Sequence, residues 1–261
     1  MALKHRVGWD PRFIERSPWF WPLGSAARYF ADHADWPSLG AYDALYAATT
    51  AQRDVPRLHF RANVRKRDKH AAGRVVVNAL YDARITLARE VPTRERDWHD
   101  LFNALCFTTF PQSKLALHAR QFRLLRDRIA QHAGQLPPTR TPEQDALTLF
   151  DEGGVVVVAA SADATQLMAA SDADRCALSA RLVSERRAWV VPFGHALFEH
   201  LVEGLRCPGG CSQILALDPC PPESSALLAE VDRALAAVIA DPRRFACPKE
   251  CAQLRLDAFQ L

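Results

Sequence analysis

The chain has no apolar run that approaches the ~18 residues a helix needs to cross a membrane. Its first residues, MALKHRVGWDPRFIERSPWFWPL, lack the uninterrupted apolar core of a signal peptide. Internal repeats, low-complexity tracts and the Gly-x-Ser-x-Gly elbow of many esterases are also missing. We therefore expect a cytoplasmic protein without a membrane partner, whose seven cysteines are reduced or metal-bound, and we rank hydrolysis by a nucleophilic side chain last.

A strong excess of charge is missing as well. The net charge of +3 is too small to imply nucleic acid by itself. Residues 53–74 are locally basic, with eight Arg or Lys against two Asp, but no aromatic residue interleaves with the cluster at 65–70. LHFRANV alternates like a strand and RVVVNALYDARITL contains strand-like runs, so we favour a solvated hairpin there over a phosphate- or nucleic-acid-binding strip.

What the chain does contain is enough apolar material for a sizeable core, since 49% of its 261 residues are hydrophobic. Four of the six tryptophans lie in the first 50 residues, where we expect short helices anchored on the core. Helices are predicted over 98–107, 111–132, 194–204 and 224–240. A β-hairpin that turns at 151–154 is predicted over 146–160; helical segments follow it to about residue 186, and a short strand follows at 188–191. The predicted fold is a single α+β domain over 1–261, mostly helical with a small antiparallel sheet, and 134–144 is its one candidate internal boundary.

The first predicted helix carries polar residues beside its apolar face. At 100° per residue, His99 and Asn103 fall together on the edge of the apolar arc, while Asp100 points nearly the opposite way. Asp97 is the expected N-cap, and a carboxylate at Asp100 suits a helix N-terminus.

Two further helices repeat this arrangement. His118 falls inside a buried stripe, with Lys114 and Gln121 beside it, and a buried imidazole needs partners for its ring nitrogens. It is either a satisfied core histidine or a site histidine with a shifted pKa. His195 and Glu199 lie one turn apart at an arc's edge, where they could be a surface pair, two metal ligands, or a base with its orienting carboxylate.

RDWHDLFNALCFTTFPQSKLAL, LTLFDEGG and FGHALFEHL resemble the motifs of an uncharacterised bacterial family known only as a domain of unknown function. Those motifs are Trp-His-Asp-Leu-x-Asn-Ala-Leu, Phe-Pro-x-x-Lys, Phe-Asp-Glu and Phe-Gly-His-Ala-Leu-x-Glu, and they span residues 80–205 in the same order. The resemblance implies no activity, but it singles out Trp98, His99, Asp100, Asn103, Lys114, Asp151, Glu152, His195 and Glu199.

The C-terminal end departs from that family, which is Gly/Pro/Trp-rich there. This chain instead carries CPGGC at 207–211 and CPKEC at 247–251. The four cysteines Cys207, Cys211, Cys247 and Cys251 could hold a structural zinc, form disulfides or be plain thiols.

The first functional hypothesis is a metal-dependent hydrolase with a polar site between helices. The expected metal is zinc, with His99, His195 and Glu199 as ligands. The catalytic candidates are His99, Asp100, Asn103, Lys114, His118, Asp151 and Glu152. One variant is a phosphohydrolase of the His-Asp type, built from His59, His99-Asp100 and Asp145. The alternative is a non-enzymatic module in which the polar residues form a buried hydrogen-bond network and the basic strip contacts an acidic partner.

Overall fold

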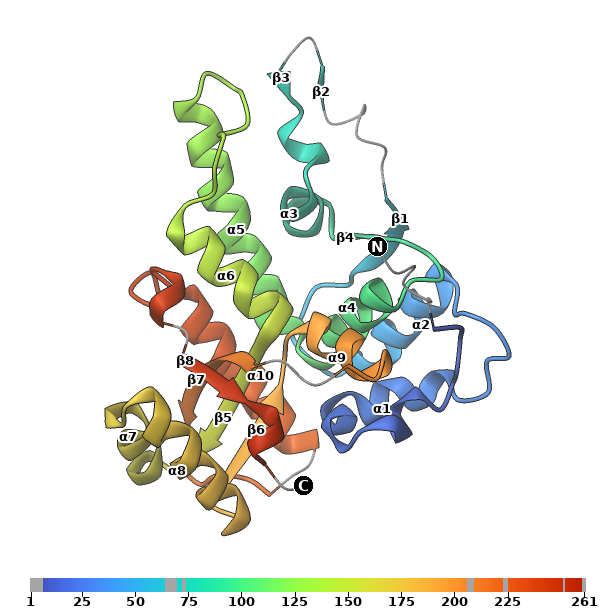
Figure 1. Ribbon diagram of the computed structural model, residues 1–261. Helices are drawn as coiled ribbons and strands as arrows, with labels where there is room; N and C mark the ends of the chain where they lie inside the picture. Colours follow the sequence, from blue (N-terminus) through green and yellow to red (C-terminus); the bar gives the residue numbers. More distant parts are fainter. Residues whose placement is uncertain are drawn as a thin grey trace.

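The computed structural model describes residues 7–63, 70–71, 74–205, 209–222, 225–250 and 252–259. The protein is a mostly helical α+β structure, as predicted (Figure 1). Its larger sheet has the strand order β6-β5-β7-β8, with β5 (Gly154–Ala159), β6 (Ala188–Pro192), β7 (Gly209–Ala216) and β8 (Ala252–Arg255). β5 is antiparallel to β6 but parallel to β7, so this sheet is mixed rather than purely antiparallel.

The central strand β5 is buried on both faces, which explains its unbroken valine run. Val156 and Val158 pack into one core with α5, α6 and α10, whereas Val155 and Val157 pack into another with α7 and α8. Figure 1 shows α7 and α8 together beside the sheet, away from the long helices α5 and α6. These helices are α5 (Pro111–Gln131), α6 (Pro142–Gly153), α7 (Ser161–Ala169), α8 (Asp172–Ser184) and α10 (Ser225–Ala240).

The hairpin predicted at 146–160 is wrong. Residues 142–153 form α6, and β5 begins directly at Gly154. A capping box between Thr141 and Gln144 starts the helix, and Leu147 and Phe150 are buried at helical spacing. The two glycines therefore end a helix instead of turning a hairpin.

The strand prediction for residues 74–87 is also wrong beyond its first two residues. β3 (Arg74–Val75) pairs with β2 (His70–Ala71), and the chain then forms short helical segments: η5 (Val77–Ala79), α3 (Tyr81–Ala83) and the π-helical η6 (Arg84–Ala88). β1 (His59–Ala62) pairs in parallel with β4 (Glu90–Thr93). Leu80 and Ala83 are buried three residues apart, which is helical spacing, and this packing overrides the local strand propensity. The centre of the basic strip, residues 64–69 and 72–73, lies outside the described residues.

An aromatic core joins the N-terminal segment to α4 and α9, as the tryptophan-rich start predicts. Trp9 stacks on Trp98 of α4, and Trp36 meets the same indole edge-on. Phe20 stacks on Phe102 of α4 and on Phe198 of α9, which brings these two helices together. The elements of this part of the structure are η1 (Phe13–Arg16), η2 (Pro18–Leu23), α1 (Gly24–Ala27), η3 (Arg28–Phe30), α2 (Leu39–Thr50), α4 (Trp98–Thr109) and α9 (His195–Val202). Elsewhere, η7 (Pro248–Glu250) and η8 (Leu256–Ala258) flank β8.

Helices α5 and α10 cap each other's ends. The Asp232 carboxylate of α10 accepts hydrogen bonds from two backbone N–H groups in the first turn of α5, at 2.8 and 3.1 Å. Arg120 of α5 in turn donates to backbone carbonyls at and beyond the C-terminal end of α10, at 2.7–2.9 Å. Lys114 and His118 lie on α5 between these two clamps, so their positions are fixed from both sides. No helix in the described ranges is long and apolar enough to span a membrane.

Candidate functional site

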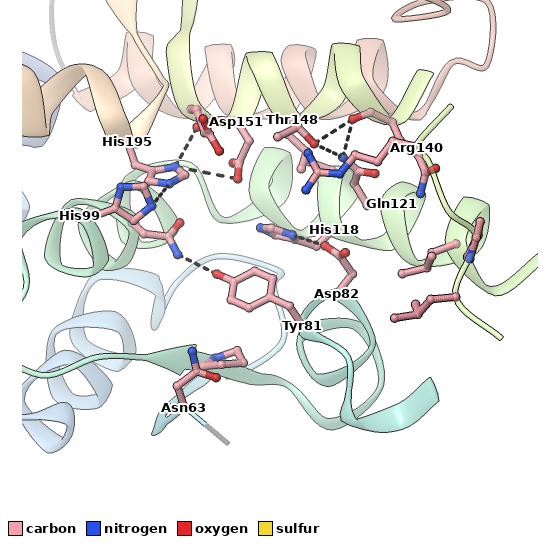
Figure 2. Close-up of a pocket in the computed structure, with 18 of the residues that line it drawn as sticks. Asn63, Tyr81, Asp82, His99, His118, Gln121, Arg140, Thr148, Asp151 and His195 are labelled. Carbon is pink, nitrogen blue, oxygen red and sulfur yellow. Dashed lines mark hydrogen bonds and ion pairs between the residues drawn. The ribbon is translucent and has the colours of Figure 1, made fainter. Parts of the chain in front are cut away.

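A polar pocket of about 690 Å³ opens between α3, α4, α5, α6 and α9 (Figure 2). Many of the predicted site residues line it: His99, Asp100, Asn103, His118, Asp151, Glu152 and His195. Helices that are far apart in sequence thus bring their polar edges together at one cavity. Lys114 and Glu199 do not line it but bind residues that do.

His195 stands at the N-terminus of α9, pressed against the end of α6. Its Nδ1 donates to the Asp151 backbone carbonyl at 2.8 Å. This approach requires the preceding glycine, because a Cβ at Gly194 would lie 2.4 Å from the carbonyl oxygen of Glu152. Burial lowers the pKa of His195 to about 3, so the ring is neutral at pH 7.

His99 faces His195 across the gap between α4 and α9. Its Nδ1 donates to the Glu199 carboxylate at 2.9 Å, and its Nε2 lies 2.9 Å from Nε2 of His195. The sequence placed Glu199 beside His195 on one helix, but the carboxylate serves the histidine of the other helix instead. The hydrogen bond to Glu199 raises the pKa of His99 above its ordinary value.

The opposed Nε2 atoms constrain the chemistry of this pair. Both Nδ1 atoms carry hydrogen, because a carboxylate and a carbonyl can only accept. Two bare nitrogen lone pairs repel at 2.9 Å, so this spacing requires a cation that both nitrogens share. That cation is either a proton, which makes His99 an imidazolium, or a metal ion.

His118 is a third imidazole whose Nδ1 is bound by an oxygen atom. Its Nδ1 bonds to the Asp82 carboxylate at 2.8 Å, its ring stacks on Phe107, and its Nε2 is buried without a partner. The residue is only 3% exposed yet lines the pocket. Figure 2 shows it between the His99–His195 pair and Arg140. An imidazole held by a carboxylate with its other nitrogen free is the arrangement of a general base.

Asn103 supplies a second polar atom without a partner. Its Nδ2 donates to the Tyr81 hydroxyl at 2.8 Å, while its buried Oδ1 has none. Burial raises the pKa of Tyr81 well above its usual range, so the phenol stays neutral. Buried polar atoms are usually satisfied, so unpartnered ones at a cavity are typical of a binding site.

Lys114 and Asp151 form a buried ion pair behind the pocket wall. Lys114 is fully buried, and its ammonium also lies 4.8 Å from the centre of the Phe107 ring. Burial alone would raise the pKa of Asp151, but the charge of Lys114 outweighs this and holds it well below its usual range. The pair fixes the residue whose carbonyl orients His195.

The other predicted residues take different positions. Asp100 binds Arg94 at 2.9 and 3.0 Å, and Asp97 caps α4 as predicted. Among the described residues, the Glu152 carboxylate forms no hydrogen bond or ion pair, although it lines the pocket. His59 bonds to Asp43, and neither it nor Asp145 lines the pocket, so the His-Asp phosphohydrolase pattern is not assembled. Within the described ranges, no three or more His, Cys, Asp or Glu side chains are grouped to hold a metal ion.

The cysteine motifs do not come together as four thiolates. Cys211 is disulfide-bonded and Cys247 is a free thiol, while Cys207 and Cys251 lie outside the described residues. A sulfur in a disulfide is not a thiolate ligand, so the four-cysteine zinc site is not formed. The expectation that every cysteine is reduced or metal-bound is wrong for Cys211.

Sequence reasoning missed Tyr81, Asp82, Arg128 and Arg140. The first two lie in the stretch mistaken for a strand; Arg128 lies in the last turn of α5, and Arg140 lies in the loop between α5 and α6. One signal was present, because a histidine inside a buried stripe requires a partner. The sequence did not say which carboxylate that partner is.

The family described as "Protein of unknown function (DUF3025)" matches residues 70–256, which include every pocket-lining residue named above. No curated protein and no solved structure matches the chain.

Proposed function

The chain belongs to the DUF3025 family, and we propose that it is a metal-dependent hydrolase whose reaction takes place in the pocket of His99, His118 and His195. The observation that carries this proposal is the pair of opposed Nε2 atoms, each on a ring whose Nδ1 is held by an oxygen. Histidines that bind metal nearly always donate their other nitrogen to a carboxylate or a carbonyl in this way.

In this proposal, His99 and His195 bind a divalent ion, with zinc as the expected one, and Glu199 orients His99 instead of acting as a ligand. The low pKa of His195 suits a ligand, because the ring is neutral and needs to lose no proton. Two imidazoles leave the other coordination positions open to water and substrate, so binding is weaker than at a three-ligand catalytic site. When bound, the ion supplies Lewis-acid chemistry.

His118 is the proposed general base. The Asp82 carboxylate accepts a hydrogen bond from Nδ1, which leaves the unpartnered Nε2 as the nitrogen that can accept a proton. The stacked Phe107 ring and the edge of Tyr81 keep the imidazole in one orientation. Asn103 offers its Oδ1 as an acceptor for the substrate or the attacking water. General-base catalysis of this kind contributes roughly 10²- to 10⁴-fold in rate.

The metal is tested by elemental mass spectrometry on untagged protein purified without chelator, together with the absorption spectrum of the cobalt-loaded protein. His99→Ala and His195→Ala should lose the metal. His132→Ala, an exposed histidine at the end of α5, should keep it and serves as the matched control. Equal metal content in all four proteins, or metal in none of them, refutes the metal site.

The reaction is tested with phosphomonoester, phosphodiester and carboxylic ester reporter substrates. Any hydrolysis found should fall by about 10²-fold or more in His118→Asn, with His132→Ala unchanged. Thermal melts show whether the variant is folded. Hydrolysis that persists in a folded His118→Asn protein refutes the role of His118 as the base.

A further inference from the structure

Two arginines at one end of the pocket lack acidic partners. Arg128 is half-buried on α5, and Arg140 is exposed on the loop that leads to α6; both line the cavity. Arg128 donates to the Thr139 backbone carbonyl and, at 3.4 Å, to Gln144 Oε1, which are neutral acceptors. Among the described residues, neither guanidinium forms an ion pair.

Arg94, the third arginine that lines the pocket, shows the contrast. Its guanidinium is bound by Asp97 and Asp100 at 2.9–3.2 Å, so its charge is already balanced. The acids nearer the centre are also taken, since Asp82 binds His118 and Asp151 binds Lys114. Glu152, the remaining acid that lines the pocket, forms no ion pair with either arginine in the described part of the chain, so neither guanidinium is neutralised by a bound carboxylate.

The surroundings of the two arginines are neutral. Figure 2 shows Gln121, Thr148 and Arg140 together at the end of the pocket away from His99 and His195. Both amide hydrogens of Gln121 are used, on the Gln144 carbonyl and the Thr148 hydroxyl, at 3.0 and 3.1 Å. Leu125, Leu136, Pro137 and Pro138 supply apolar lining. A guanidinium presents a planar fork of donors that matches carboxylate and phosphate oxygens.

We propose that Arg128 and Arg140 bind an oxyanion group, a phosphate or a carboxylate, of the substrate. His118, whose buried Nε2 lacks a partner, lies between Arg140 and the His99–His195 pair, so the anionic group sits away from the bond that reacts. This assignment of substrate class rests on the proposed hydrolase for the identity of the reacting end. The anion site itself does not need the metal.

Isothermal titration of metal-free protein with inorganic phosphate, and separately with succinate, tests the site and distinguishes the two oxyanions. Saturable binding of at least one anion is expected. Arg128→Gln and Arg140→Gln should each weaken it about tenfold or more, as expected for losing a charge-assisted hydrogen bond. Arg123→Gln removes an exposed arginine of the same helix that does not line the pocket and should leave binding unchanged.

The same titration of His195→Ala separates this proposal from the metal site. Anion binding that survives His195→Ala and is lost in Arg140→Gln supports an arginine site even if the protein holds no metal. Binding lost in His195→Ala but kept in both arginine variants overturns the proposal, and so does the absence of saturable binding of either anion to the wild type.

Discussion

Replacing Lys114 with methionine tests the buried ion pair on which the orientation of His195 depends. Methionine keeps most of the length and apolar stem of lysine, so the change removes the charge and leaves little cavity. The Asp151 carboxylate, 14% exposed, then loses its neutralising partner. We expect the variant to be folded but much less stable than the wild type at pH 7.

The size of the effect follows from two independent estimates. Two unit charges about 3 Å apart attract by roughly 5 kcal/mol at an effective dielectric constant near 20. Breaking a buried pair by removing one partner costs about 3–5 kcal/mol. Protonation of Asp151 limits the cost of the lone carboxylate: at pH 7, neutralising a group of ordinary pKa near 3.9 takes about 4 kcal/mol. The expected loss in the free energy of unfolding is thus about 3–5 kcal/mol.

The stability of Lys114→Met should also change with pH in the opposite direction to that of the wild type. In the wild type the pKa of Asp151 is lowered, so its contribution is fully present above its unfolded pKa and is lost only below that pH. In Lys114→Met, burial raises the folded pKa, so the folded state binds a proton that the unfolded state releases. Its stability therefore recovers as pH falls from 7 to 5, by up to about 2.7 kcal/mol relative to the wild type.

Urea unfolding of both proteins at pH 7 and pH 5 measures these differences. The double variant Lys114→Met/Asp151→Asn, which removes both charges, should regain most of the stability. A loss below about 1 kcal/mol at pH 7, or an equal loss at both pH values, would show that the pair is not buried and coupled in the way described.

Three other changes test the site's framework. In metal-free protein, Glu199→Gln should lower the pKa of His99 in NMR titrations, and an unchanged pKa would contradict the pairing. The raised pKa of His99 stabilises the folded wild type at low pH, and this stabilisation is lost as pH rises through that pKa. The loss of stability in Glu199→Gln should therefore be larger at pH 6 than at pH 9. Asp97→Ala should cost about 1 kcal/mol in urea unfolding through loss of the α4 N-cap, whereas Asp97→Ser should cost little. Gly194→Ala should lower the stability by about 1–3 kcal/mol and displace His195, and a wild-type melting temperature would argue against the close backbone contact.

The helices that carry the site could be predicted because their signals are local. The apolar spacing, the Asp97 cap and Pro111 mark α4 and α5 to within two residues at each end. The polar edge of each helix is likewise a property of its own sequence, so His99, Asn103 and His195 could be selected before any contact was known.

The partners could not be predicted, because each lies on another element. Glu199 faces His99 rather than its own neighbour His195, and Asp82 reaches His118 from a stretch whose valine and isoleucine content favours a strand. The two glycines after Glu152 fit a turn as well as a helix end. The pairing of the buried valines of β5 could not be predicted either, because its parallel partner β7 follows much later in the sequence.

The parallel pairing of β5 with β7 has a consequence for synthesis on the ribosome. Four consecutive valines leave the exit tunnel some 50 residues before the strand that covers one edge of β5 (Figure 1). Until residues 209–216 emerge, the nascent chain presents an apolar edge open to pairing with other chains. Asp151 lies just before β5 and His195 just after β6, so this end of the pocket is attached to the strands whose sheet the late strand β7 extends.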